Sequence, residues 1–361
     1  MNDEVFMKRA IELARGPAST SPNPRVGAVA VRSKQIVAET AYGGPGTPHA
    51  EAALTTMGDL RDADVYVTLE PCSHHGTTPP CADALIEAGV ARVVAAGRDP
   101  DQRVSGSGFA KLEAAGIKVT IGILEDEARL LNLGYLHQRA TGRPLVTLKV
   151  ASSLDGKFSA SDGSSRWITG PDARRKVHSR RAEVDAVLTG SGTVIADDPA
   201  LTARDVDIDP IRQPIPIVVD SHGRVAASAK IFERPGAIVA TVPGIPHERE
   251  TEWKEAGAEV LVLPPHPDGG VDLAELLRAL SSRAWNEIYC EAGPRLTTSL
   301  IDEDLVDVIE WHLAPKLVGG TGEGVGDIGV GHIRDAVRFK ILRTQRIGDD
   351  VILTLERRAG H

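Results

Sequence analysis

Short apolar runs alternate with amphipathic segments along this chain. Residues 26–31, 65–69 and 92–96 have the length and apolar content of buried strands. Residues 4–15 instead place their apolar side chains at helical spacing. Strands that alternate with helices are typical of α/β proteins built on a mostly parallel sheet. The pattern therefore predicts an α/β fold.

A Gly- and Pro-containing break at residues 140–144 divides this pattern into two parts. At 361 residues the chain is long for one core and suits two. We predict a three-layer α/β domain over residues 1–142, with a further strand at 118–121 and a final helix at 125–139. We predict a second α/β domain over residues 143–361. Its predicted strands are 145–150, 186–189, 215–220, 238–241, 259–263, 287–290 and 307–313, with helices at 173–182 and 273–282.

The overall charge disfavours some partner classes. The formal net charge is −9 at pH 7, so a nucleic acid is not expected as the main partner, and a local basic pocket would be needed to bind a small phosphate. Neither an apolar run of membrane-spanning length nor a signal-peptide pattern at the start is found, and the chain has 3 Cys. We therefore expect a cytoplasmic enzyme with a small-molecule substrate, no membrane partner and a homo-oligomeric state.

Three residues have the chemistry and spacing of a zinc site. His49 precedes Glu51 by two positions, and Cys72 and Cys81 follow with eight residues between them. One imidazole and two thiolates leave the fourth tetrahedral position open, which hydrolytic zinc enzymes require and structural sites avoid. Residues two apart on a helix face different ways, so Glu51 is expected to move protons and not to bind the metal. This pattern predicts a catalytic zinc site.

The flanking sequence predicts how the ligands are placed. Thr47 and Pro48 have the pattern of an N-cap and first helical residue, which puts His49 in a first helical turn. Residues 78–81 repeat this pattern at Cys81, where the helix dipole favours a thiolate. A closed structural zinc site is the alternative, with His74 or His75 as fourth ligand.

The first half resembles the cytidine deaminase superfamily in its His-x-Glu and paired Cys motifs. Residues 68–76, TLEPCSHHG, and 78–81, TPPC, are similar to the deaminase half of the bifunctional riboflavin-biosynthesis deaminase/reductase family, over about residues 7–139. The resemblance implies zinc-dependent hydrolytic deamination of a pyrimidine, with Glu51 transferring protons. It also implies that Asn23 contacts the pyrimidine.

Four positions depart from the pattern of this family. Tyr42 stands where a His is usual, Thr77 where a basic residue is usual, and Asp101 and Gln102 where Asn and Pro are usual. The loss of a cation at Thr77 removes one phosphate partner. The metal ligands and Glu51 are intact, so we expect these departures to affect substrate binding more than the chemistry.

The second half is similar to the reductase half of the same family. The resemblance rests on residues 148–156, 165–170, Arg181, 190–193 and 196–204, and covers about residues 143–356. It implies a dihydrofolate-reductase-like α/β fold that uses NADPH. By resemblance, the NADPH site is lined by Ala151, Trp167, Thr193, Asp197, Ser221, Gly293, Pro294, Arg295, Leu296, Thr297, Thr298 and Ser299, and the substrate site by Ser165, Arg181, Leu201, Arg204 and Glu291.

The backbone patterns of this half can be compared with known phosphate cradles. Gly190 and Gly192 follow a predicted strand, but Ile195 is not small and Pro199 limits the following helix, so a Rossmann site is disfavoured. Residues 291–299 combine a strand end, a Gly-Pro turn and a helix start, whose N–H groups can bind an anion. Lys149 and Asp197 are candidates for proton handling because of their location.

These observations favour a bifunctional enzyme of riboflavin synthesis. It would deaminate 2,5-diamino-6-(5-phosphoribosylamino)pyrimidin-4-one with one Zn²⁺ per chain, and then reduce the ribosyl group with NADPH to give 5-amino-6-(5-phosphoribitylamino)uracil. Two alternatives are a zinc-containing regulatory or scaffold protein with a degenerate second domain, and a nucleic-acid deaminase with an unrelated extension. Ammonia release that depends on Glu51 and competition by oligonucleotides would separate them.

Overall fold

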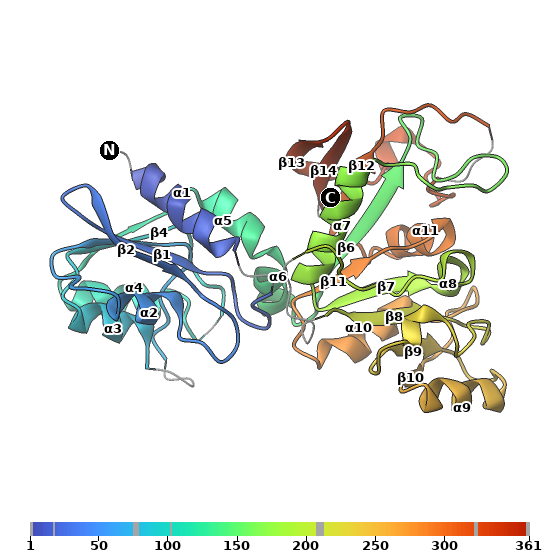
Figure 1. The fold of residues 1–361 in the computed structure, drawn as a ribbon, viewed down its shortest axis with the longest axis horizontal. Coiled ribbons are helices and arrows are strands. Elements are labelled where there is room, and N and C mark those ends of the chain that lie inside the picture. Colours follow the sequence, from blue (N-terminus) through green and yellow to red (C-terminus); the bar gives the residue numbers. More distant parts are fainter. Residues whose placement is uncertain are drawn as a thin grey trace. The chain divides into compact units, whose positions relative to one another are not determined.

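The chain forms two compact units, Met1–Gly142 and Arg143–His361, in the computed structural model (Figure 1). The structure describes residues 3–16, 19–74, 79–101, 103–206, 213–320 and 324–358. Both units combine a β-sheet with packed helices, which confirms the predicted α/β class.

The first unit is built on a five-stranded sheet with the order β2-β1-β3-β4-β5. Strands β3, β4 and β5 run parallel, whereas β1 is antiparallel to both of its neighbours, β2 and β3. Its elements are α1 (Asp3–Ala14), β1 (Gly27–Arg32), β2 (Gln35–Ala41), α2 (Ala50–Thr55), β3 (Asp64–Val67), α3 (Cys81–Glu87), β4 (Arg92–Ala95), α4 (Ser107–Ala114), β5 (Lys118–Ile121), α5 (Glu125–Leu131) and α6 (Leu133–Thr141).

Helices cover both faces of this sheet, as the three-layer prediction requires. On one face, Met7 and Ile11 of α1 and Ala128 of α5 pack against β1, β3 and β4. Helices α2, α3 and α4 lie on the other face (Figure 1), where Leu54 of α2 and Leu85 of α3 belong to one core with Phe109 and Leu112 of α4. The strands are apolar on both sides because both sides are covered.

Two features of this unit differ from the sequence-based expectations. The helix expected at 125–139 is two helices that meet at Asn132, whose side chain accepts from the backbone N–H of Arg25 and donates to its carbonyl. This distant hydrogen bonding outweighs local helix propensity. Strand β2 is not predicted by the pattern because its first three residues are exposed and it forms the edge of the sheet.

The second unit is built on a nine-stranded sheet with the order β10-β9-β8-β7-β11-β6-β12-β14-β13. Its elements are β6 (Leu145–Ser152), α7 (Pro171–Glu183), β7 (Ala186–Gly190), α8 (Ser191–Asp197), β8 (Ile215–Val219), the 3₁₀ helix η2 (Lys230–Phe232), β9 (Ile238–Thr241), α9 (His247–Glu255), β10 (Glu259–Val262), α10 (Leu273–Ser281), β11 (Glu287–Cys290), α11 (Pro294–Asp302), β12 (Val308–Leu313), the 3₁₀ helix η3 (Ile333–Asp335), β13 (Phe339–Ile347) and β14 (Asp350–Arg357).

All strands of this sheet from β10 to β12 are parallel to their neighbours, and β14 and β13 add an antiparallel hairpin at one edge. Helices α10 and α11 pack on one face, and α7 and α9 contribute to the core on the other. The hairpin is not predicted from the sequence because its residues are mostly half-exposed and its first strand is rich in charge. In the described part of the chain, no helix has the length and apolarity needed to cross a bilayer.

Candidate active site

Three elements of the first unit bring the zinc motif together. His49 directly precedes α2, Cys72 follows the end of β3, and Cys81 is the first residue of α3. The prediction of an N-cap at Thr47 is wrong. The Thr47 hydroxyl donates to the Gly44 carbonyl at 2.7 Å, and the helix begins only at Ala50. The sequence motif is nevertheless assembled by two helix starts and one strand end.

The three side chains have the spacing of a zinc site. The Nδ1 atom of His49 lies 3.7 Å from Sγ of Cys72 and 3.3 Å from Sγ of Cys81. The ligand atoms of the group all lie within 4.8 Å of one another. Tetrahedral zinc with usual Zn–S and Zn–N lengths places such atoms about 3.5 Å apart. The residues therefore fit a zinc ion.

The ionisation of the two thiols also favours a bound cation. Hydrogen bonding from Cys81, with help from His49, lowers the pKa of Cys72 to about 4. The contact of Cys81 with Cys72, together with burial, raises the pKa of the Cys81 thiol well above its usual range. Two adjacent thiolates repel each other, so both ionise together only when a positive charge lies between them. A divalent metal held by these residues would supply this charge.

Glu51 lies next to this group but is not a member of it. It occupies the first turn of α2, and its side chain is buried, with 4% exposed. Burial raises the pKa of the Glu51 carboxyl to about 7. A carboxyl group with a pKa near neutrality can both accept and return a proton. Its position matches the proton-transfer role expected from the sequence.

The alternative of a closed structural site receives no support from the described residues. Among them, the group with metal-ligand spacing consists of His49, Cys72 and Cys81, and does not include His74. His74 lines the adjoining pocket, and its buried Nδ1 makes no hydrogen bond. His75 lies outside the described residues.

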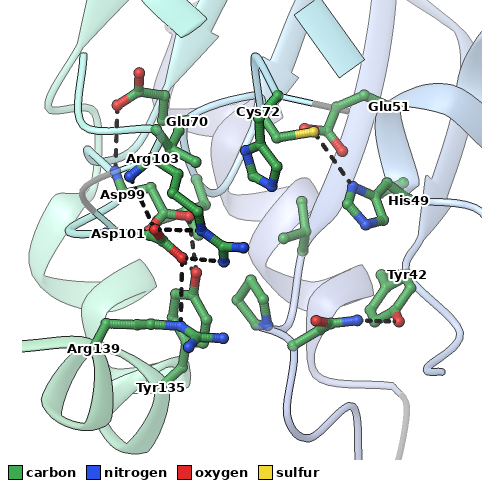
Figure 2. Close-up of a pocket in the computed structure, with 17 residues that line it drawn as sticks. Tyr42, His49, Glu51, Glu70, Cys72, Asp99, Asp101, Arg103, Tyr135 and Arg139 are labelled. Carbon is green, nitrogen blue, oxygen red and sulfur yellow. Dashed lines mark hydrogen bonds and ion pairs between the residues drawn. The ribbon is translucent and has the colours of Figure 1, made fainter. Parts of the chain in front are cut away.

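A pocket of about 100 Å³ opens beside the metal-binding residues (Figure 2). This volume is several times what one water molecule needs, so the space can admit part of a ligand. His49, Glu51 and Cys72 line one side of it. Asn23 and Tyr42 also line it, and the Asn23 amide donates to the Tyr42 hydroxyl at 2.7 Å. Asn23 therefore lies where the resemblance places a pyrimidine contact.

Glu70 organises a loop on the opposite side of this pocket. Its carboxylate accepts from the backbone N–H groups of Gly106 and Gly108, both at 3.0 Å, and from that of Asp99 at 3.4 Å. At Gly108 the chain passes so close to Pro71 that a Cβ would lie 2.0 Å from its carbonyl oxygen. The loop after β4 is thus held against the strand end that carries Cys72.

A charged cluster that sequence reasoning missed occupies this loop and α6. The Asp101 carboxylate accepts from Nε and Nη2 of Arg103 at 3.0 and 2.6 Å, and lies 3.7 Å from Nε of Arg139. The Tyr135 hydroxyl donates to Asp99, and Arg139 stacks over the Tyr135 ring. All five line the pocket (Figure 2). Helical spacing of Tyr135 and Arg139 could have placed both on one face, but their contact with Asp99 and Asp101 depends on tertiary folding.

Two of the four atypical positions can be placed. Tyr42 and Asp101 both line the pocket, so both departures lie where a substrate would be bound. Hydrogen bonding from Arg103 lowers the pKa of the Asp101 carboxyl to about 2, and it is therefore charged where an Asn would be neutral. Thr77 and Gln102 lie outside the described residues.

In the second unit, the candidate cofactor residues gather at one sheet edge. Ala151 lies near the end of β6, Thr193 follows β7, Ser221 follows β8, and Gly293 follows β11. Since these strands are parallel neighbours, their carboxyl ends meet, which is where α/β sheets bind ligands. A Cβ on Gly293 would lie 3.2 Å from Oγ1 of Thr193, so the two loops are adjacent.

The predicted phosphate cradle has the expected backbone form. Helix α11 begins at Pro294, with Gly293 as its N-cap and no side chain capping its N–H groups. These N–H groups are therefore available for an anion, as a dinucleotide phosphate requires. The first turns of α11 and the capping Gly contain the expected residues, which are Gly293, Pro294, Arg295, Leu296, Thr297, Thr298 and Ser299.

The candidate substrate residues of this unit form a second group. Nε and Nη2 of Arg181 donate to the Glu291 carboxylate at 2.6 and 2.9 Å. Nη1 of Arg181 also donates to the Thr202 carbonyl, which brings the loop of Leu201 and Arg204 to the same place. Arg204 is exposed, whereas Leu201 is buried.

The remaining candidates differ in their surroundings. Trp167 is 61% exposed and stacks with Arg174, so it is not a core residue. Ser165 is also exposed. Asp197 pairs with Arg166 at 2.8 Å, and burial lowers the pKa of the Lys149 ammonium. Asp197 therefore forms an ion pair, whereas burial favours the neutral form of Lys149.

Comparisons with protein families match both halves of the chain. The family described as cytidine and deoxycytidylate deaminase zinc-binding region matches residues 1–97. The family described as RibD C-terminal domain matches residues 144–353. The two matches cover the zinc motif and the sheet of the second unit, respectively.

Similar proteins extend over the whole chain. The riboflavin biosynthesis protein RibD of Escherichia coli (strain K12) is 44% identical over 369 residues, covering 98% of this chain and 99% of the relative. The structure of Acinetobacter baumannii RibD, form 1, matches with a TM-score of 0.85 and 39% identity over 99% of both chains. A diaminohydroxyphosphoribosylaminopyrimidine deaminase/5-amino-6-(5-phosphoribosylamino)uracil reductase from Thermotoga maritima matches with a TM-score of 0.82 and 33% identity over 98% of both chains.

Proposed function

Because this chain belongs to the RibD family of riboflavin biosynthesis proteins, we propose specific roles for its residues in the two reactions of that family. The chain is a bifunctional enzyme with a zinc-dependent deaminase activity and an NADPH-dependent reductase activity. Full-length similarity to RibD proteins disfavours both the scaffold protein and the nucleic-acid deaminase. It acts on a small molecule.

The deaminase is assigned to residues 1–142 and the reductase to residues 143–361. The family matches at 1–97 and 144–353 support this division, and so do the two compact units of the chain. The name of the Thermotoga maritima relative supports the substrates: a phosphoribosylaminopyrimidine for the first reaction and a phosphoribosylamino-uracil for the second.

In the deaminase, His49, Cys72 and Cys81 would hold a zinc ion, which would supply the Lewis acidity that this hydrolysis needs near neutral pH. Glu51 accepts the proton of the attacking water and delivers protons to the ring nitrogen and the departing ammonia. Its burial keeps the proton between carboxylate and substrate. Asn23, held by Tyr42, orients the pyrimidine ring through its amide.

In the reductase, the N-terminus of α11 and the adjoining Thr193, Ser221 and Ala151 would hold NADPH, which would supply the hydride. Arg181, fixed by Glu291, and Arg204 hold the phosphorylated substrate. Trp167, Ser165 and Leu201 complete the two binding sites. Lys149 and Asp197 remain the candidates for proton handling, and burial lowers the pKa of the Lys149 ammonium.

The observation that carries the deaminase assignment is the buried Glu51 beside three ligands with zinc spacing. In the Glu51→Gln variant we expect a roughly 10²- to 10⁴-fold loss of ammonia release, because the proton-transfer group is removed while the ligands are kept. NADPH oxidation should persist when the deaminated pyrimidine is supplied. Ammonia, NADPH absorbance and zinc content are measured on the same preparations.

A matched variant controls for any general effect on ammonia release of removing a carboxylate from this unit. Glu113 lies exposed on α4 of the same unit, and Glu113→Gln should leave ammonia release unchanged. If Glu51→Gln released ammonia at the wild-type rate with zinc still bound, the proposed role of Glu51 would be wrong.

The enzyme is further proposed to be a cytoplasmic homo-oligomer. A reducing compartment is supported by the need of Cys72 and Cys81 to stay as thiols for metal binding. Self-association is supported by large apolar side chains exposed on the second unit, with Leu317 at 78% and Ile333 at 85%. Sedimentation of the purified protein tests the oligomeric state, and monomeric behaviour would exclude it.

A further inference from the structure

The deaminase pocket has an uneven distribution of charge. Among the described residues that line the pocket, two are arginines, Arg103 and Arg139, and none is a lysine. Both arginines lie at the end of the pocket opposite His49 and Glu51. Figure 2 shows the guanidinium of Arg103 extending from this cluster toward the middle of the pocket. The pocket thus has a metal-binding end and an end with two guanidinium groups.

The local pairing of Asp101 with Arg103 is not in itself evidence of a ligand site. Asp59 and Arg61 form the same pair two residues apart, with Nε and Nη2 donating to the carboxylate, on an exposed loop of the same unit. Asp101 differs because it is buried, lines a pocket, and also attracts Arg139 from α6. Two guanidinium groups therefore share a single buried carboxylate.

This sharing leaves binding capacity for an anion. A guanidinium has five N–H groups, and Asp101 engages one edge of Arg103 through Nε and Nη2. Nε of Arg139 is buried and has no hydrogen-bond partner among the described residues, although it lies 3.7 Å from Asp101. Arg103 and Arg139 both pair with Asp101, and burial raises the pKa of the neighbouring Asp99, which favours its neutral form. Arginine pairs of this kind are well suited to a phosphate, which accepts several charge-assisted hydrogen bonds.

The substrate of the proposed reaction has a matching distribution of groups. Its pyrimidine must reach the metal ligands and Glu51, and its phosphate lies at the other end of the ribosylamino group. An enzyme with a net charge of −9 needs local cations to hold that phosphate. Resting on the proposed deaminase function, we propose that Arg103 and Arg139 bind the substrate phosphate in this pocket, with Asp101 orienting both guanidinium groups.

The first test compares a phosphorylated with a dephosphorylated substrate. In the Arg103→Gln variant of the zinc-loaded enzyme, we expect KM for deamination of the phosphoribosylaminopyrimidine to rise about 10- to 100-fold, as the loss of charged hydrogen bonds implies. KM for the corresponding ribosylaminopyrimidine should change less than about 3-fold, and kcat should be little affected for either compound. Arg139→Gln should act in the same direction.

The control is Arg61→Gln, which breaks the same kind of Asp-x-Arg pair at the surface and should leave both KM values unchanged. An equal rise of KM for both substrates in Arg103→Gln would overturn the proposal, because the arginine would then act only on pocket structure. A fall in KM would also overturn it, since Arg103 would then be an obstruction.

A second test does not depend on deamination. Calorimetric titration of the zinc-loaded protein with ribose 5-phosphate should show one binding site fewer in Arg103→Gln than in wild type and Arg61→Gln. Sites in the second unit are common to all three proteins and cancel in the comparison. An unchanged titration would overturn the phosphate site, whereas loss of the site in a protein that releases no ammonia would refute only the deaminase function.

Discussion

At the scale of single residues, two buried glutamates of the deaminase unit have different roles because their partners differ. Glu51 has a pKa raised to about 7 by burial and lies beside the metal ligands. Glu70 is equally buried, but backbone N–H groups of Gly106, Gly108 and Asp99 surround its oxygens. Glu70 therefore anchors the loop through these hydrogen bonds, whereas the raised pKa of Glu51 supports the proton-carrying role proposed for it.

The anchoring role of Glu70 can be tested with Glu70→Gln. The amide NH₂ would face at least one backbone N–H donor, so we expect the free energy of unfolding to fall by about 1–3 kcal/mol. The loop that carries Asp101 and Arg103 would loosen, and KM for deamination should rise. Urea unfolding and ammonia-release kinetics measure the two effects.

Glu87→Gln, at an exposed position at the end of α3, is the matched control and should show neither effect. Reductase kinetics with the deaminated substrate should be normal in both variants. A Glu70→Gln protein with wild-type stability and KM would show that the loop does not depend on this carboxylate.

At the scale of elements, helix α7 is joined to the second sheet by a buried ion-pair network. Arg180 contacts Glu310 of β12 at 2.6 Å, Glu287 of β11 at 2.5 Å, and Glu183 on its own helix at 2.6 Å. The Tyr289 hydroxyl donates to Glu310. One guanidinium thus connects a helix to two neighbouring strands, and breaking one partner of such a network leaves a buried charge unpaired.

The network predicts a dependence of stability on pH. Burial opposes ionisation of Glu310, but Arg180 and His312 outweigh it and lower its pKa to about 2. A lowered folded-state pKa adds stability above the unfolded value of about 4.3, and this stability is lost as the pH falls toward 2. For Glu310 the loss is up to about 3 kcal/mol.

Glu310→Gln isolates this contribution. We expect the variant to be less stable than wild type at pH 7 and the difference to shrink between pH 5 and pH 2, as followed by urea unfolding. The pKa of Glu287 is shifted in the opposite direction, upward, mainly because of burial. Glu287 is present in both proteins, so its contribution is common to both and does not affect the comparison. Glu259→Gln, which removes an exposed partner of Arg283, is the surface control and should change the free energy of unfolding by less than about 1 kcal/mol. A constant difference for Glu310→Gln would contradict the assignment.

At the scale of the whole molecule, the two units have separate cores and separate chemistries. The metal ligands lie in Met1–Gly142, whereas the expected NADPH and reductase substrate residues lie in Arg143–His361. The hydrophobic clusters of each unit are formed from its own residues. Loss of one site is therefore not expected to unfold the other unit.

Removal of zinc tests this independence. Treatment with a chelator should abolish ammonia release, whereas NADPH oxidation with the deaminated pyrimidine should stay within about 2-fold of the untreated enzyme, because the second site needs no metal. Added zinc should restore ammonia release. Loss of both activities on chelation would show that the two units depend on each other.

Much of the fold was predictable from the sequence, and the wrong predictions each have a physical reason. The buried strands β4, β9 and β11 were predictable within a residue, because covered strands are continuous apolar runs, and the half-exposed edge strand β5 was predicted with its bounds. Strand β2 and the hairpin of β13 and β14 were missed, because their partly exposed positions carry polar and charged residues. The break at Asn132 was missed because its hydrogen bonds are to Arg25, more than 100 residues away.

The sequence by itself determined the α/β class and the zinc-binding chemistry, because apolar runs and the residue types His49, Cys72 and Cys81 are local properties of the chain. Only the tertiary structure brought Asp101, Arg103, Tyr135 and Arg139 to one pocket. In the sequence, charged residues on a loop and on a later helix cannot be told apart from ordinary solvent-exposed residues. Only folding places them around one cavity. Their function therefore depends on distances between segments, which no local pattern encodes.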